Sequence, residues 1–104
     1  RTDRVVTASP VHVPAGCVLV FDGVFLQRSK LASWWDFVIF LRIDPEVALK
    51  RAITRDGGSM ADDVERRYRE RYMPGQEHYL RSVGPETRAD VVIDTTGVPF
   101  IVRL

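Results

Sequence analysis

Two arginines spaced one helical turn apart are the strongest chemical signal in the chain. Arg51 and Arg55 lie in the stretch LRIDPEVALKRAITRD of residues 41–56. On a helix, side chains at positions i and i+4 project from the same face. Two planar, permanently charged guanidinium groups at this spacing can hold a polyphosphate through paired hydrogen bonds. Solvated basic helix faces show the same spacing, so the motif leaves open both a phosphate site and a plain surface.

A carboxylate, Asp22, follows the apolar run CVLVF of residues 17–21 and precedes Gly23. A continuous apolar run of this length is typical of a strand that is buried on both faces of a parallel sheet. Open α/β sheets gather their ligands at the carboxyl ends of such strands, which is where Asp22 would lie. An ordinary Asp-Gly turn explains the same residues without any ligand.

A basic and aromatic stretch, ERRYRERYMPGQEHY, covers residues 65–79. Tyrosines between arginines occur on surfaces that bind nucleic acid. Here carboxylates offset the charge, and Val64, Tyr68 and Tyr72 recur every four residues as a helical core stripe. We therefore interpret most of these arginines as surface residues in i,i+4 ion pairs.

The elements that would position these side chains alternate between strand and helix. Residues 1–16 contain Pro10, Pro14 and Gly16, which predict an irregular arm. A strand, a helix and a second strand in succession form a βαβ unit, so we predict an α/β fold with a parallel sheet. The predicted strands are 17–21, 37–43 and 89–94, the predicted short helix is 27–35 with Leu26, Leu31 and Trp34 or Trp35 facing inward, and 100–103 is a terminal extended piece.

Local signals delimit the longer helices. Asp44 caps the first of them, Pro45 takes its first position and Glu46 suits its positive end. Its predicted core stripe is Ala48, Leu49, Ala52 and Ile53. The sequence 56–59 should break this helix, Asp62 or Asp63 should start another, Pro74-Gly75 should bend or interrupt it, 76–83 should continue it, and Gly84-Pro85 should end it.

Four segments resemble, in this order, the second half of the uridine kinase group of P-loop kinases: VLVFDGVFL, WWDFVIFLRIDPEVALKRAITRD, ERRYRERYMPGQEHY and ADVVIDTT. The resemblance covers roughly residues 17–96. It implies part of a doubly wound parallel sheet of the P-loop nucleoside and nucleotide kinase type. Residues 17–56 would be strand, helix, strand and helix, 57–83 a lid and helical segment, and 84–104 the last strand and tail.

The resemblance also implies an activity, namely ATP-dependent transfer of a phosphoryl group to the 5′-hydroxyl of uridine or cytidine. Magnesium would come with ATP, and Asp22 would help to hold it. Arg51 and Arg55 would close over the phosphates, while Asp56 would orient Arg55 or form the hinge of the lid. Near the acceptor nucleoside, the resemblance places Arg67, Arg71 and Gln76, and Arg1-Thr2-Asp3 is similar to a motif on the same side.

Composition narrows the alternatives. With 104 residues, 45% hydrophobic and 10% aromatic, the chain is expected to form one small domain. A net charge of +1 gives no reason to expect nucleic acid or a membrane as a partner. Cys17 is the only cysteine, which favours a reducing, cytoplasmic setting and a packing role in a strand. His12 and His78 lack the spacing of metal ligands. The first residue is Arg1 rather than Met, so we expect a longer gene product.

One element of the resembled family is missing from these residues. The loop G-x-x-x-x-G-K-[ST], whose backbone N–H groups cradle phosphates, does not occur. The chain alone is therefore expected to be inactive as a kinase. In the resembled kinases, the strand before that loop lies between the strands equivalent to 17–21 and 37–43. These two could close on each other, the arm at 5–13 could fill the gap, or a second copy could supply the edge, and we favour self-association.

Two other functions fit the same residues. The chain could be a non-catalytic module that binds an anion or nucleotide or serves as an interaction domain. It could also belong to a P-loop kinase that acts on a non-nucleoside alcohol such as pantothenate or a sugar phosphate, because acceptor specificity depends on pocket residues that the sequence does not identify.

Overall fold

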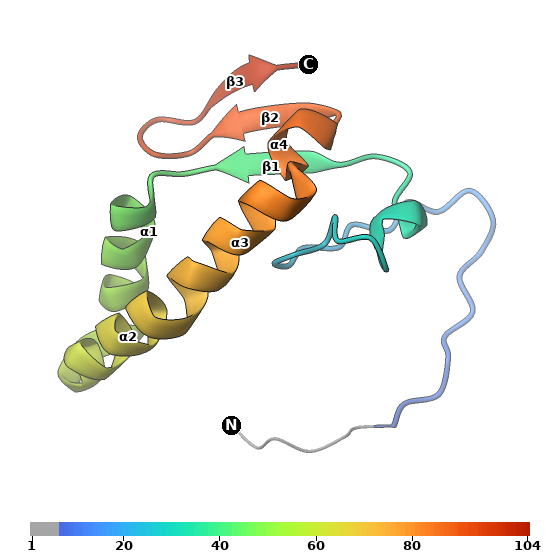
Figure 1. Cartoon of the computed structure of the whole chain (residues 1–104). Helices are drawn as coiled ribbons and strands as arrows, with labels where there is room; N and C mark the ends of the chain where they lie inside the picture. Colours follow the sequence, from blue (N-terminus) through green and yellow to red (C-terminus); the bar gives the residue numbers. More distant parts are fainter. Residues whose placement is uncertain (1–6) are drawn as a thin grey trace.

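Three short strands form one sheet in the order β1-β2-β3. The computed structural model describes residues 7–104. Strands β1 (Ile39–Arg42) and β2 (Val91–Asp94) are parallel, with Ile39 opposite Val91 and Arg42 opposite Asp94. Strand β3 (Phe100–Arg103) runs antiparallel to β2 (Figure 1). The predicted α/β class is confirmed, as are the strands predicted within 37–43 and 89–94 and the extended piece at 100–103.

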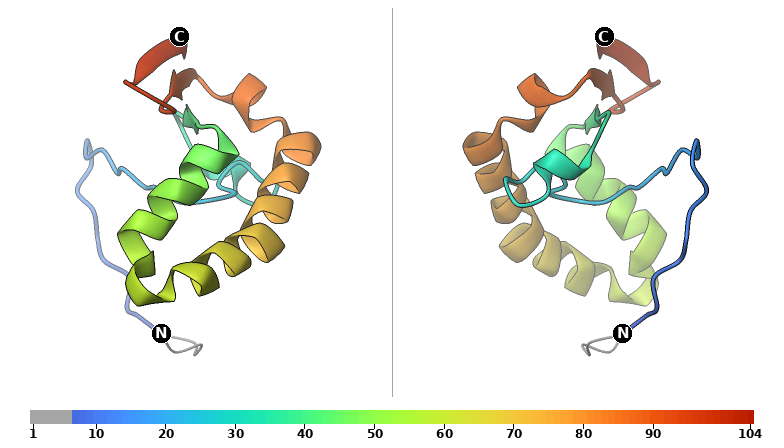
Figure 2. Two further views of the ribbon diagram at one scale, coloured as in Figure 1. Left: turned by 90° about the vertical axis from the view of Figure 1, so that its left-hand side faces the viewer. Right: turned by 90° about the vertical axis from the view of Figure 1, so that its right-hand side faces the viewer.

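A chain of helices connects β1 to β2. It consists of α1 (Pro45–Ala52), a π-helical turn (Ile53–Gly57), a 3-10 turn (Gly58–Met60), α2 (Ala61–Arg67), a second π-helical turn (Tyr68–Tyr72), α3 (Met73–Val83) and α4 (Pro85–Arg88). These helices form a bent arch on one side of the sheet (Figure 2). Within residues 7–104, no helix has the length and apolar character needed to cross a membrane.

Helix α1 begins and ends where local signals predict. The Asp44 carboxylate accepts hydrogen bonds from the backbone N–H groups of Glu46, at 2.9 Å, and Val47, at 3.3 Å. These bonds satisfy N–H groups that have no partner inside the helix. Leu49 and Ala52 are buried, so the predicted core stripe is confirmed at its centre.

The helical arch changes direction and winding at glycine and proline. Gly58 has a φ of +46°, a conformation that most residues avoid, and it separates the turns between α1 and α2. Before Pro74, the Met73 N–H bonds to the carbonyl of Tyr68, five residues back. A proline has no N–H and its ring clashes with the carbonyl four residues earlier, which explains the wider turn. Gly84, at φ +62°, then ends α3 as predicted.

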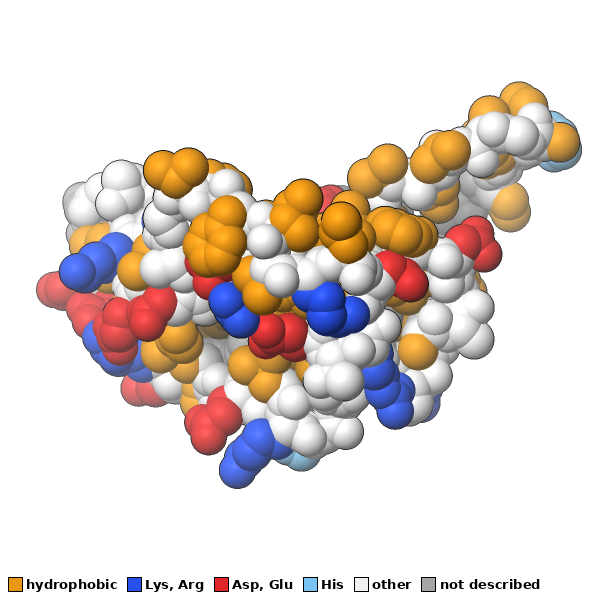
Figure 3. Space-filling model, turned by 90° about the horizontal axis from the view of Figure 1, so that it is seen from above, with side chains coloured by type: hydrophobic (Ala, Val, Ile, Leu, Met, Phe, Trp, Pro, Cys, Tyr) orange, Lys and Arg blue, Asp and Glu red, His pale blue; other side chains and the backbone are white. Residues whose placement is uncertain are grey.

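The sheet is covered on one face only. Val92 is 1% exposed and packs on the helical side, together with buried Leu49 and Tyr79. On the other face, Ile39 is 54% exposed and Leu41 is 59% exposed. Hydrophobic side chains accordingly gather over the strands when the molecule is viewed from the side of β3 (Figure 3). The expectation that the strand at 37–43 is buried on both faces is wrong, because no second helical layer covers this face in residues 7–104.

Two elements predicted near the start of the chain do not form as expected. Residues 17–21 are exposed and belong to no strand, so Cys17 does not pack in one. An apolar run becomes a strand only when a neighbouring strand accepts its hydrogen bonds, and none does so here. The helix predicted at 27–35 is reduced to a 3-10 turn at Ala32–Trp34. Residues 7–16 are irregular, as predicted.

The segment after this run is held to α3 and α4 by specific bonds. The Gln27 N–H donates to the Tyr79 hydroxyl, and the Gln27 side-chain amide donates to the Pro85 carbonyl, both at 3.0 Å. The Trp35 indole N–H donates to the Leu26 carbonyl, and Trp35 is therefore the inward-facing tryptophan, while Trp34 is 73% exposed.

Candidate functional site

The carboxyl ends of β1 and β2 lie side by side and are joined by backbone bonds. The Thr95 N–H donates to the Arg42 carbonyl at 2.7 Å. The backbone N–H of Asp44, just before α1, donates to the Thr96 hydroxyl at 3.0 Å. The loop after β2 is thus fastened to the start of α1, at the edge of a parallel strand pair where α/β folds bind ligands.

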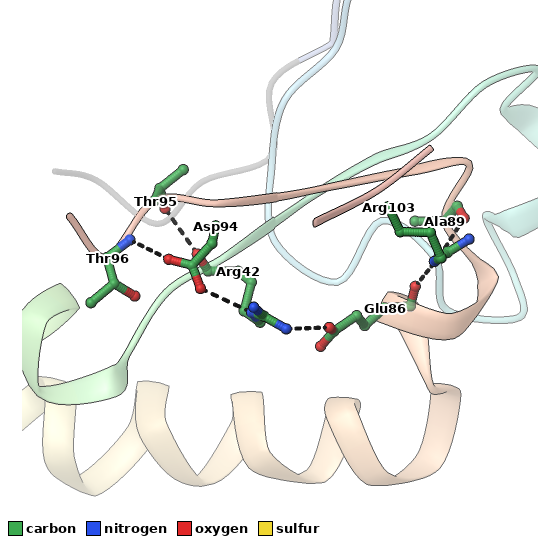
Figure 4. A network of polar contacts seen from close by, with 7 residues as sticks. All are labelled: Arg42, Glu86, Ala89, Asp94, Thr95, Thr96 and Arg103. Atoms are coloured by element: carbon green, nitrogen blue, oxygen red, sulfur yellow. Dashed lines mark hydrogen bonds and ion pairs between the residues drawn. The ribbon is translucent and has the colours of Figure 1, made fainter. Parts of the chain in front are cut away.

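A charged network extends from this edge toward α4 (Figure 4). Arg42 donates to the carboxylates of Asp94 and Glu86, each at 3.0 Å. The Thr96 N–H donates to the other oxygen of Asp94 at 2.9 Å. This N–H and the Arg42 guanidinium lower the pKa of Asp94, since both stabilise its charged form. The two carboxylates raise the pKa of Arg42 in return. Arg103 closes the far end by donating to the carbonyls of Glu86 and Ala89.

The lowered pKa of Asp94 predicts an acid-dependent contribution to stability. The contribution is present above the unfolded pKa, near 3.8, and is lost as the pH falls through the lower folded pKa. Asp94→Asn should lower the thermal midpoint at pH 7 and flatten its decline below about pH 4. Asp36→Asn is the control, because Asp36 is exposed and makes no hydrogen bond in the described structure. Parallel acid titrations of the wild type and Asp94→Asn would contradict this assignment.

The two arginines of the opening motif lie at this same edge but hold different partners. Arg51 on α1 donates to the Thr96 carbonyl at 2.9 Å, across 45 residues of sequence. Arg55 pairs with Asp56 at 2.7 Å, and this pairing lowers the pKa of Asp56 and raises that of Arg55. Both arginines are exposed, so an anion can reach them from solvent.

Asp22 lies apart from this edge in the described structure. It is exposed and follows an irregular segment, because the strand expected before it does not form. Among residues 7–104, no three His, Cys, Asp or Glu side chains are grouped so that they could hold a metal ion. Arg1-Thr2-Asp3 lies outside the described residues.

The arginines of the basic helical stretch divide into two groups. Arg66 pairs with Asp63, and Arg69 pairs with Glu65 and Glu46 at 3.1 Å, which confirms the interpretation of surface ion pairs for these two. Arg67 and Arg71 are exposed. The three residues expected near the acceptor are therefore separated, since Gln76 lines a cavity to which neither Arg67 nor Arg71 contributes.

That cavity, which we call the β1 groove, has a volume of about 330 Å³ and lies between β1, α1 and α3. Tyr68 and Tyr72 line it, with ring centroids 4.5 Å apart, and burial raises the pKa of Tyr68. The Gln76 side-chain oxygen is buried without a hydrogen-bond partner. The remaining lining residues are Phe40, Leu41, Arg42, Ile43, Pro45, Ala48, Met73, Glu77, Leu80 and Glu86.

Sequence reasoning missed Arg42, Glu86 and Thr96, although one signal pointed to two members of the network. Arg42 and Asp94 each stand at the carboxyl end of an apolar run. Parallel strands in register bring such ends together, so an opposite charge at each end predicts a pair. Glu86 and Thr96 gave no comparable signal, because their positions depend on how α4 and the β2–β3 turn pack.

Comparisons with models of known protein families, with curated proteins and with solved structures find no match to this chain.

Proposed function

We propose that the chain is part of an ATP-dependent nucleoside kinase and contributes the arginines that close over the transferred phosphate. The observation that carries the proposal is the position of Arg51, which reaches from α1 to the Thr96 carbonyl at the carboxyl ends of two parallel strands. Arg55 follows one turn later on the same helical rod and is exposed. Two guanidinium groups beside such an edge are suited to a polyphosphate.

The finer fold that we propose is a partial doubly wound sheet of the P-loop kinase type. Support comes from the parallel pairing of β1 with β2 and from the long helical connection between them. The opening motif begins in β1 and continues through α1 into the π-helical turn, as expected for an arm that leads from the sheet into a lid.

The chemistry of this site would be positioning and charge stabilisation. Phosphoryl transfer spreads negative charge over the transferred group, and an arginine placed against it can contribute about 10³ to 10⁵ in rate. Magnesium typically binds proteins through one or two carboxylates together with phosphates and waters, so the single exposed Asp22 carboxylate fits the ion that accompanies ATP. Arg67 and Arg71 would face the uridine or cytidine acceptor, and the setting would be cytoplasmic, without nucleic acid or membrane as a partner.

Titration with inorganic tripolyphosphate tests the central step of the proposal. The wild-type chain should bind it, and Arg51→Ala and Arg55→Ala should each weaken binding by about tenfold or more, since a hydrogen bond to a charged group contributes about 1.5 to 3 kcal/mol. Lysine at either position should restore binding only in part, because it lacks the fork. Arg81→Ala is the matched control, since Arg81 is also exposed but lies in the last turn of α3.

Equal affinities of the wild type and both alanine variants would remove the arginines from the phosphate site. Tripolyphosphate binding that depends on Arg51 and Arg55, in a protein that turns over no nucleoside when complete, would instead favour the anion-binding module. Turnover of pantothenate or a sugar phosphate in place of a nucleoside would favour the kinase for another alcohol.

A further inference from the structure

Strand β1 has a hydrogen-bonded neighbour along one edge only. It pairs with β2 and stands at the end of the sheet. Four consecutive residues, 40–43, line the β1 groove. Because successive side chains of a strand point to opposite faces, a cavity lined by four in a row runs along the strand's edge. The strand Ile39–Arg42 contains neither lysine nor proline, which commonly protect such an edge.

The β1 groove calls for an occupant with two properties. Its walls are largely apolar, with Phe40 from β1 and Met73 and Leu80 from α3 among them. Within these walls, the Gln76 oxygen is buried and lacks a hydrogen-bond donor. Buried acceptors in native proteins are almost always satisfied. An apolar, extended peptide meets both requirements, since its side chains match the walls and its backbone N–H groups can reach an acceptor.

The chain itself carries a segment of this kind. Residues 17–21, CVLVF, are apolar and contain two β-branched valines, and they make no strand pair in the described structure. Their side chains are strongly exposed, at 87% for Val18, 77% for Leu19, 87% for Val20 and 59% for Phe21. The segment leads into an arm that runs outside the sheet and helices (Figure 1). Phe21 alone is anchored, by stacking of its ring on Trp35 at 5.6 Å.

We propose that two copies of the chain associate by exchanging residues 17–21, each run adding a strand along the open edge of β1 in the other copy. The exchange occupies both β1 grooves and covers both exposed runs, and it supplies the missing donor to Gln76. A second copy is the occupant that the structure favours, because one chain carries the run and the groove in equal number. The pairing is reciprocal, so it closes as a two-fold dimer and leaves neither element open.

Sedimentation of the 104-residue chain at micromolar concentration tests this proposal. The wild type should be a dimer, and Val20→Lys should raise the dissociation constant by roughly 100-fold, since a lysine in an apolar groove loses the burial of a valine and must desolvate a charge. Val98→Lys is the matched control. Val98 is also 87% exposed, yet it lies in the β2–β3 turn, so its replacement should leave the dimer intact.

A peptide of residues 16–23 tests the groove separately, because Val20 is exposed and its replacement leaves the fold unchanged. The peptide should bind the monomeric Val20→Lys chain one to one and slow hydrogen exchange at β1 amides that do not bond to β2. A strictly monomeric wild type would overturn the proposal. So would equal weakening by Val20→Lys and Val98→Lys, or a peptide that binds without protecting β1.

Discussion

Leu49→Ala is expected to lower the free energy of unfolding by roughly 2 to 5 kcal/mol, as is typical when a buried leucine is truncated. Leu49 is 2% exposed and is one of the few fully buried side chains of the described structure. It fixes α1 against the sheet, so its loss removes apolar contact and leaves a cavity that the surrounding helices fill only in part. A loss of this size is a large fraction of the 5 to 15 kcal/mol that holds an ordinary domain together.

Urea denaturation followed by circular dichroism measures this loss. Leu104→Ala is the matched control, because Leu104 is 83% exposed and its truncation should change the free energy of unfolding by less than about 0.5 kcal/mol. If Leu49→Ala costs less than about 1 kcal/mol, α1 does not pack on the sheet as described.

Helix α1 was predictable because its signals are local. A capping aspartate, a proline at the first position and an apolar stripe all act within a few residues, and the structure shows Asp44 bonded to the first two N–H groups of the helix. Gly84 and the winding change before Pro74 belong to the same class. Each depends on the backbone freedom of one residue rather than on a distant partner.

Residues 17–21 show where such reasoning ends. Their composition predicts a buried strand, but a strand also needs a neighbour that accepts its hydrogen bonds, and composition does not supply one. The exposed face of β1 has the same origin, since alternation of side chains shows which residues share a face but not what covers it. Both differences concern contacts between distant segments.

The candidate site divides in the same way. The pair Arg51 and Arg55 was identified from spacing on a helix, and the structure places both near the carboxyl ends of β1 and β2. Asp22 was placed through a strand that does not form, and the site therefore lacks its expected carboxylate in the described structure. Arg42 and Asp94 meet because the strands are parallel and in register, which requires the sheet order to be known.

The chain alone is expected to show no turnover of ATP with uridine or cytidine. Arginines such as Arg51 and Arg55 accelerate phosphoryl transfer only for a phosphate that is already held in line with its acceptor. The loop that would hold it, G-x-x-x-x-G-K-[ST], is absent from the sequence. A radiolabel assay should therefore give the background of a sample without protein. The Arg51→Ala, Arg55→Ala double variant is the control, because a contaminating kinase would act equally in both preparations. Turnover well above background in the wild type, abolished in the double variant, would show that these residues suffice for catalysis and would contradict the prediction.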